Sequence, residues 1–310
     1  MLSIKNAFIF QAGIGVSANT FLLLLHIFTL LQHRRPKPTD LVTCHLAFVH
    51  IVLLLTVVDV SPVDVFESLN FGNDFKCKAL FYTSKVMRGL SICSTCLLSV
   101  LQAVTISPST SWLARFKRRL TKYIIHIFLF FWFLNLSVSS NLIFTVVSFN
   151  VTQTNLLKVS RHCSLSPRSF ILRCVTFTLS TSRDVSCVGI MLLSSAYMVT
   201  VLCKHRKRSR HLHSPGLTPA TSPEKRATQT ILLLVGFFVD LLSMYFMDLI
   251  TSFISTLLWT YDPVIMSVQK FVFNAHATAI PLVQISSDKR IIDILQNMQS
   301  QFHQFLMLVM

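Results

Sequence analysis

Two cations lie inside a long apolar stretch of this sequence. Lys85 and Arg88 both fall within residues 77–106, which are otherwise poor in charge. A helix of this length, at about 1.5 Å per residue, exceeds the roughly 30 Å hydrocarbon core of a bilayer. Cations in such a span are costly and usually face a protein interior. Residues three apart share a helix face. The pair therefore indicates a polar site on one side of a membrane-spanning helix.

Other polar residues in apolar stretches could line the same site. Arg183 and Lys270 add positive charge, Asp248 adds negative charge, and Ser84 adjoins Lys85. We expect a cavity at the outer end of a helix bundle. The candidate ligand-binding residues are Ser84, Lys85, Arg88, Arg183, Asp248 and Lys270.

Motifs of enzyme and metal chemistry are missing from the sequence. It has no Gly-rich phosphate loop, no nucleophile elbow and no HExxH motif. Cys93 and Cys96 form a lone CxxC inside an apolar segment, where small cysteines usually serve packing. We therefore expect no catalytic residues, no metal site and no cofactor.

Composition predicts an all-α membrane protein. The chain has 310 residues, of which 52% are hydrophobic and 13% charged, with a mean hydropathy of +0.61. Soluble domains carry about 25% charged residues. We expect a single seven-helix bundle and a short cytosolic tail at 287–310. The predicted spans are 8–31, 40–60, 77–106, 123–149, 183–203, 227–254 and 264–286.

The start of the fifth span is harder to place than the others. Residues 170–202 are too long for one span and include Arg173, Arg183 and Asp184. We place the membrane part at 183–203 and expect 170–182 to be a structured outer segment.

The first apolar run is too long for a signal peptide, so we expect it to act as a signal anchor.

The charge distribution predicts the orientation. The net charge is +16, and most of the Lys and Arg outside the spans lies in loops 1–2, 3–4 and 5–6. Because cytosolic loops are enriched in these residues, the N-terminus should be outside and the C-terminus cytosolic. The enrichment of cytosolic loops in Lys and Arg explains the net positive charge, and we expect no nucleic-acid partner.

This orientation places the sequon at Asn150 on the outer side, where glycans are attached. A second sequon match, at Asn135, lies within a span.

The same orientation places two cysteines in an oxidising compartment. Cys77 begins the third span and Cys163 lies in the second outer loop. A disulfide between them can persist on that side. We predict a Cys77–Cys163 bridge, with Cys174 as the competing partner because the start of the fifth span is not sharply marked.

Seven helices with this cysteine arrangement look like a G-protein-coupled receptor, and several motifs resemble the vomeronasal type-1 receptor family. The matching segments are HRRPKPTD at 33–40, CHLAF at 44–48, RGLSICSTCLLSVLQAVTISP at 88–108 and SPEKRATQTI at 222–231. Residues 276–281 match more loosely. Leu101-Gln102-Ala103 replaces the Asp-Arg-Tyr of rhodopsin-like receptors, and His50 replaces their sodium-binding Asp. An ionic lock at position 102 and a carboxylate sodium site at position 50 are therefore excluded.

The resemblance implies a pheromone receptor in the plasma membrane of vomeronasal sensory neurons. Its partners would be a small-molecule ligand and a Gi/Go-class G protein. Basic cytosolic segments are the expected G-protein contacts, although such segments also attract anionic lipid. These contacts are Arg115, Lys117, Arg118, Arg119, Lys204, Arg206, Lys207 and Arg208.

Two interpretations of the interior cations remain open. Arg88 could pair with Asp59 or Asp248 and hold the bundle together, which its place in a family-wide motif favours. Alternatively, surplus positive charge could bind an anionic ligand, such as a sulfated steroid. In that case Lys85 is the better candidate for selectivity.

Three alternatives to a signalling pheromone receptor remain. A bitter-taste-type receptor is disfavoured by the cysteine arrangement and the motifs. A transporter or channel could use Asp240, His50 and His276 as a proton path, but no internal repeat is visible. A chain that no longer signals is the third alternative.

Overall fold

The computed structural model describes most of the chain between its first helix and residue 287. The described residues are 2–32, 37–57, 73–107, 112–148, 157–158, 163–166, 169–212, 242–243, 245–247, 249–254 and 263–287, with Ile291, Gln296, Ser300 and Gln304.

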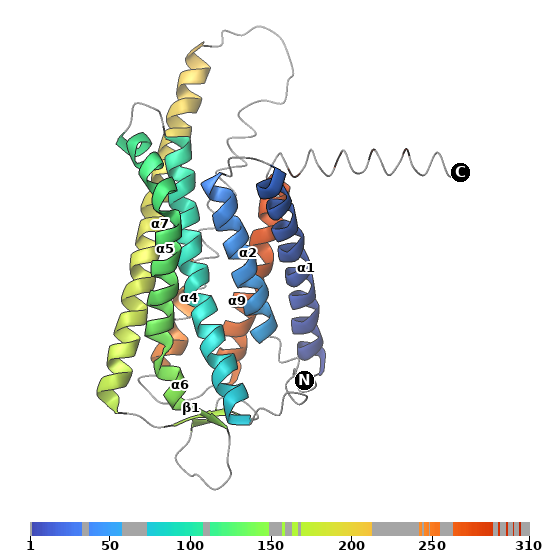
Figure 1. Ribbon diagram of the computed structural model, residues 1–310, viewed down its shortest axis with the longest axis vertical. Helices are drawn as coiled ribbons and strands as arrows, with labels where there is room; N and C mark the ends of the chain where they lie inside the picture. The colour runs from blue at the N-terminus through green and yellow to red at the C-terminus, as the bar shows by residue number, and fades with distance from the viewer. Residues whose placement is uncertain are drawn as a thin grey trace.

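Long helices standing side by side make up nearly all of the described structure (Figure 1). They are α1 (Leu2–Gln32), α2 (Pro38–Val57), α4 (Asn73–Ile106), α5 (Trp112–Ser139), α7 (Phe170–Leu212) and α9 (Pro263–Ser287). A short helix, α6 (Asn141–Thr145), follows α5.

Five helices in the described part are long and apolar enough to cross a membrane. Their apolar segments are Asn6–Leu31, Pro38–Thr56, Phe75–Ile106, Lys122–Thr145 and Phe170–Val201. The chain is therefore a helical membrane protein. The expected span 227–254 falls mostly outside the described residues, and α9 covers the expected span 264–286.

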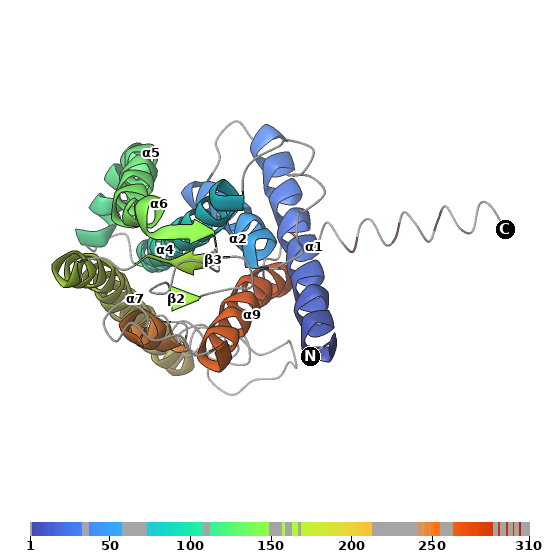
Figure 2. The same cartoon turned by 90° about the horizontal axis from the view of Figure 1, so that it is seen from below.

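Helix α4 is the centre of the bundle. Of its most apolar segment 78% is buried, against 28% in α1 and 17% in α5. Viewed from below, the other helices surround it (Figure 2). Three apolar clusters lie along it, around Val86 and Leu90, around Ile92 and Cys96, and around Leu98 and Leu101. The helix that carries Lys85 and Arg88 is thus the one whose surface faces protein.

Proline marks several helix ends. Pro38 begins α2 and Pro263 begins α9, where the missing amide hydrogen of proline is not needed. Pro108 follows the end of α4 at Ile106, since the residue before a proline is disfavoured in helical conformation.

Two elements differ from the sequence expectation. The expected span 123–149 continues past the end of α5 at Ser139 through α6 to Thr145, and residues after Thr145 form strand β1 (Val146–Ser148) instead of helix. The expected separation of 170–182 from the fifth span is also absent. Helix α7 runs without interruption from Phe170 to Leu212, so Arg183 lies well inside it rather than at its outer end.

A small antiparallel sheet lies across one end of the bundle (Figure 2). Its strands are β1, β2 (Leu157–Lys158) and β3 (Cys163–Leu165), in the order β1-β3-β2. Val146 is opposite Leu165, and Leu157 is opposite the same residue from the other side. The sheet places Cys163 beside the first turns of α4.

Candidate ligand-binding site

A disulfide joins the sheet to the central helix. Cys77 of α4 and Cys163 of β3 are bonded, with their Cα atoms 5.7 Å apart. Both are buried and pack with Val146, Phe81 and Leu142. The predicted pairing is confirmed, and the competing candidate, Cys174, is a half-buried free thiol in α7.

Arg88 lies against an aromatic ring of another helix. Its guanidinium carbon is 4.5 Å from the centre of the Phe273 ring in α9. Phe273 is almost fully buried and packs with Ile92, Cys187 and Met191. A guanidinium over a ring face is attracted by the ring quadrupole, more strongly where water is excluded. The contact joins α4 to α9.

The neighbours of Arg88 on α4 are accessible in part. Ser84 and Lys85, about one turn away, are both half-buried, as Arg88 is. All residues from 78 to 85 of α4 are half-buried, and the mostly buried part of the helix begins at Val86, so Lys85 and Arg88 lie where the helix changes from partly accessible to buried. Asp59 and Asp248, the expected counter-charges of Arg88, lie outside the described residues.

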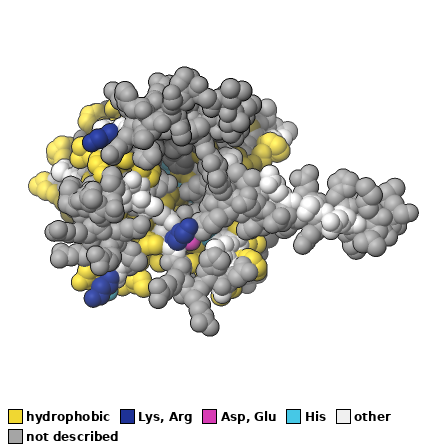
Figure 3. Space-filling view, turned by 90° about the horizontal axis from the view of Figure 1, so that it is seen from above, with side chains coloured by type: hydrophobic (Ala, Val, Ile, Leu, Met, Phe, Trp, Pro, Cys, Tyr) yellow, Lys and Arg dark blue, Asp and Glu magenta, His cyan; other side chains and the backbone are white. Residues whose placement is uncertain are grey.

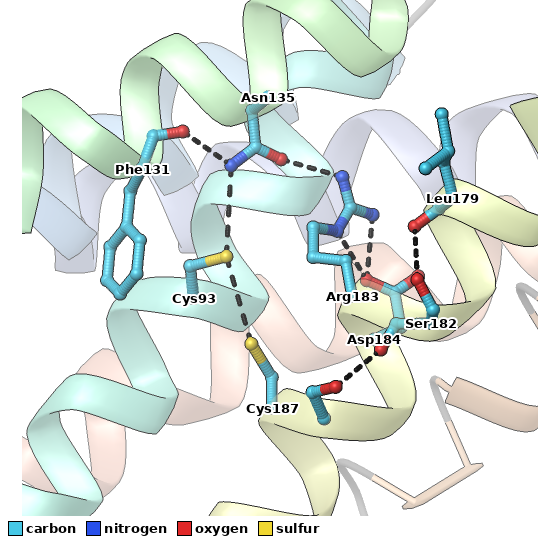
Figure 4. A network of polar contacts seen from close by, with 9 residues as sticks. Cys93, Phe131, Asn135, Leu179, Ser182, Arg183, Asp184 and Cys187 are labelled. Carbon is cyan, nitrogen blue, oxygen red and sulfur yellow. Dashed lines mark hydrogen bonds and ion pairs between the residues drawn. The ribbon is translucent and has the colours of Figure 1, made fainter.

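Arg183 is committed to a separate polar network (Figure 4). Its Nε donates to Asp184 Oδ1 at 2.7 Å, and its Nη2 lies 2.7 Å from the same oxygen. Its Nη1 donates to Asn135 Oδ1 of α5, also at 2.7 Å. Both members of the ion pair are buried. The network connects α5 to α7 inside the membrane-spanning part of the bundle.

Asn135 extends the network to the central helix. Its Nδ2 donates to the Phe131 carbonyl at 2.8 Å and lies 3.8 Å from Cys93 Sγ of α4. Cys93 Sγ in turn is 3.9 Å from Cys187 Sγ of α7 (Figure 4). Because Asn135 is fully buried in α5, its own sequon is inaccessible to glycosylation.

Gly89 provides the space for this network. A Cβ atom on Gly89 would lie 2.6 Å from Arg183 Nη1 and closer still to Asn135 Oδ1. Any larger residue here would force these two groups apart. Neither Gly89 nor Asn135 was singled out from the sequence as a network residue. A glycine directly after an intramembrane arginine is the signal that could have drawn attention to the position.

The structure therefore divides the predicted cationic cluster. Lys85 and Arg88 remain together on α4, whereas the charge of Arg183 is neutralised by Asp184 of its own helix. Lys270 is exposed on α9, and Asp248 is outside the described part of the chain. Nε, Nη1 and Nη2 of Arg183 each already contact Asp184 or Asn135.

Histidines form further polar links in the core. His50 Nε2 of α2 is 2.9 Å from Ser91 Oγ of α4, and its ring centre is 5.9 Å from that of His276 in α9. His45 accepts a hydrogen bond from Trp132 Nε1 at its Nε2, at 3.0 Å. Neutral His45 must then carry its proton on Nδ1, which donates to Ser94 Oγ at 3.0 Å. His45 thus connects α2, α4 and α5 with a defined tautomer.

The opposite end of the bundle carries exposed cations. Figure 3 shows Lys and Arg side chains spread over that end with apolar side chains around them. Lys37 next to the start of α2, Lys122 within α5 and Lys204 within α7 are exposed. Asn150 and the side chains of most predicted G-protein contacts are outside the described residues, namely Arg115, Lys117, Arg118, Arg119, Arg206, Lys207 and Arg208.

A hydrogen bond joins α4 and α7 toward this end. Ser107 Oγ and Tyr197 OH are 2.9 Å apart, and both side chains are partly buried. Sequence reasoning gave neither residue a role.

A central helix with partly buried cations, surrounded by membrane-length helices and bonded to a sheet at one end, defines a polytopic helical membrane protein with a polar interior. The chain belongs to the vomeronasal organ pheromone receptor family, the type-1 receptors, whose family model matches residues 2–297. This is a family of receptors and not of enzymes, and membership implies a pheromone receptor.

Individual members of the family resemble the chain over nearly its whole length. Vomeronasal type-1 receptor 90 of Rattus norvegicus is 43% identical over 296 residues, covering 95% of this chain and 94% of the receptor. Vomeronasal type-1 receptor 48 of Mus musculus is 41% identical over 295 residues, covering 95% of this chain and 96% of that receptor. Vomeronasal type-1 receptor 47 of Mus musculus is 40% identical over 297 residues, covering 96% of this chain and 94% of that receptor.

Proposed function

We propose that this chain is a seven-helix pheromone receptor of the plasma membrane, with its N-terminus outside and its C-terminus cytosolic. It binds a small molecule in a cavity toward the outer end of the bundle and activates a Gi/Go-class G protein. Family membership over the whole chain supports the receptor class. The observation that carries the ligand site is the pair of half-buried cations, Lys85 and Arg88, next to the buried part of the central helix.

The ligand chemistry follows from the charges near this face. Lys85 and Arg88 place two cations on one face of α4, and Arg183 is paired with Asp184 of its own helix. An anionic group with an apolar body, such as a steroid sulfate, fits both parts of the site. The anion would bind Lys85 and the edge of the Arg88 guanidinium. The body would pack near Phe273, whose ring already contacts Arg88.

The proposed mechanism is a shift between two arrangements of the helices. A ligand can shift this equilibrium only by binding one arrangement more tightly than the other. Contact with Arg88 would alter the α4–α9 packing at Phe273. The rigid helix α4 would carry the change to its cytosolic end, where Ser107 meets Tyr197. The basic ends of α5 and α7 would then contact the G protein.

A G-protein dissociation assay tests the proposal. Cells expressing the chain would carry Gi/Go reporters and be exposed to steroid sulfates, neutral steroids and small volatiles, with surface labelling as a control. We expect dissociation that depends on the ligand and favours the sulfates. Responses to neutral steroids alone would contradict the anionic ligand. Ligand-dependent current or uptake with the G proteins removed would contradict the receptor mechanism.

A further inference from the structure

Three buried carboxamide atoms of α1 and α9 have no hydrogen-bond partner among the described residues. Asn274 of α9 is 0% exposed, yet neither its Oδ1 nor its Nδ2 has a partner in the described part of the chain. Gln11 of α1 has a buried Oε1 atom that also lacks one. Buried polar groups in proteins are nearly always hydrogen-bonded, and in the interior of a membrane protein an orphaned one is costly.

The register of the two helices brings these amides to the same level. Phe8 of α1 meets Phe271 of α9, with ring centres 6.2 Å apart. A turn or two further on, a Cβ on Gly15 would lie against the Thr278 side chain. The residue of α9 follows its partner in α1 by the same number of positions in both pairs. The two helices therefore run in the same direction, and each step along one is matched by an equal step along the other. Gln11 and Asn274 have that same offset and therefore lie across from each other.

The neighbouring contacts indicate that this interface is closely packed. Thr278 Oγ1 donates to the Gln11 carbonyl at 3.4 Å, about one turn inward of Asn274. Asn19 Nδ2 donates to the carbonyls of Gly15 at 2.7 Å and Ala277 at 2.9 Å. Asn19 is thus satisfied by backbone oxygens that span the interface. At the level of Gln11 and Asn274 no such group among the described residues serves the amides.

We propose that Gln11 and Asn274 bind ordered water that links α1 to α9. The available groups are two carbonyl oxygens that accept and one amide nitrogen that donates. Water supplies two donors and also accepts, so one molecule can donate to both carbonyl oxygens, whereas a hydroxyl group of a lipid accepts but supplies only one donor. Neither residue is charged, so the pair has no strong attraction for an ion. This site is independent of the ligand and of G-protein coupling.

Thermal unfolding of the purified receptor in nanodiscs tests the proposal. A thiol-reactive dye can report unfolding, because Cys93, Cys96 and Cys187 are buried free thiols. Asn274→Leu keeps the volume but removes every hydrogen bond to water. If water satisfies the amide, we expect Tm to fall by about 2–4 °C. If the amide is truly orphaned, its removal leaves Tm unchanged or raises it, and the proposal is overturned.

A double mutant isolates the link between the two residues. Gln11→Met alone should lower Tm, and Gln11→Met with Asn274→Leu should lower it by less than the sum, because both remove the same bridge. Strictly additive shifts would contradict a shared water. A shift that depends on the sterol content of the nanodiscs would overturn the proposal by assigning the site to a lipid hydroxyl.

A high-resolution map of the unmodified receptor gives an answer that does not depend on folding of the variants. We expect an ordered oxygen within hydrogen-bond distance of both side chains. A direct hydrogen bond between the Gln11 and Asn274 amides would overturn the proposal.

Discussion

Gly89 is the residue at which the α4, α5 and α7 contacts converge. Gly89→Ala should lower Tm by several degrees, because the added methyl must separate Arg183 Nη1 from Asn135 Oδ1. At most exposed helix positions, replacing glycine with alanine instead stabilises the folded protein by up to about 1 kcal/mol. Thermal unfolding with the thiol-reactive dye measures the difference.

Gly189 of α7 is the matched control for this substitution. A Cβ atom there meets nothing within 4 Å. Gly189→Ala should therefore keep or raise Tm. Equal changes in Tm for Gly89→Ala and Gly189→Ala would contradict the idea that Gly89 is needed to make room for the Arg183–Asn135 contact.

Lys85 is the residue whose charge should set ligand preference. If it binds an anionic group, Lys85→Ala should weaken the apparent affinity for steroid sulfates by roughly 10- to 100-fold, the loss of one charge-assisted hydrogen bond. Concentration–response curves in the G-protein assay measure this. Lys122→Ala removes an exposed charge from α5 and should have no such effect. Unchanged sulfate responses in the Lys85 variant, with normal surface labelling, would exclude the role.

At this scale the sequence identified the residues better than their partners. Intramembrane charge alone marks Lys85, Arg88 and Arg183 as interior groups. The contact of Arg88 with Phe273 was not predictable, because any of the many phenylalanines could present a ring face. The pairing of Arg183 with Asp184 depends on rotamers, since adjacent residues on a helix do not ordinarily face each other.

Among the elements, the end of α4 and the middle of α7 share a contact suited to switching. The Ser107–Tyr197 hydrogen bond joins them in this structure. Suppose that activation separates α4 from α7 at this contact. Tyr197→Phe should then stabilise the active arrangement, relative to the inactive one, by the net free energy of one hydrogen bond. Basal G-protein dissociation should then rise by about two- to tenfold.

Tyr123→Phe serves as the control, since Tyr123 is exposed on α5. It should leave basal dissociation unchanged. A fall in basal dissociation with Tyr197→Phe would mean instead that the hydrogen bond belongs to the active arrangement.

Apolar length predicted where helices lie but not where they end. The position of α9 was predictable from hydropathy, with the expected 264–286 inside Pro263–Ser287. Helix α7 was not, because charge at Arg183 and Asp184 suggested a membrane boundary. The internal ion pair removes that charge penalty and lets the apolar helix continue. Strands of two or three residues, such as β2, are too short to show a periodic pattern.

For the whole molecule, the proposed orientation predicts a single glycan. Asn150 should be glycosylated, and Asn150→Gln should abolish the mobility shift caused by glycosidase. The other sequon begins at Asn135, which is buried in α5. A remaining shift in the variant, or none in the unmodified chain at the cell surface, would contradict the proposed topology.

The disulfide makes a second prediction at this scale. Cys163→Ser should release the sheet from α4 and reduce surface labelling, because it removes a cross-link that closes a long loop. Cys174→Ser should not, since that thiol is free. Surface labelling of both variants under matched expression measures the difference.

The ion pair between Arg183 and Asp184 also bears on how the chain is made. A lone arginine or aspartate near the centre of a helix costs roughly 2.5–3.5 kcal/mol when the translocon passes that helix into the bilayer. These two residues are neighbours, so α7 carries its own counter-charge and needs no other helix to supply one. The pair can thus enter the lipid as an electrically neutral unit during synthesis. Asn135 then joins the guanidinium only when α5 and α7 assemble, which makes insertion and assembly two separate steps.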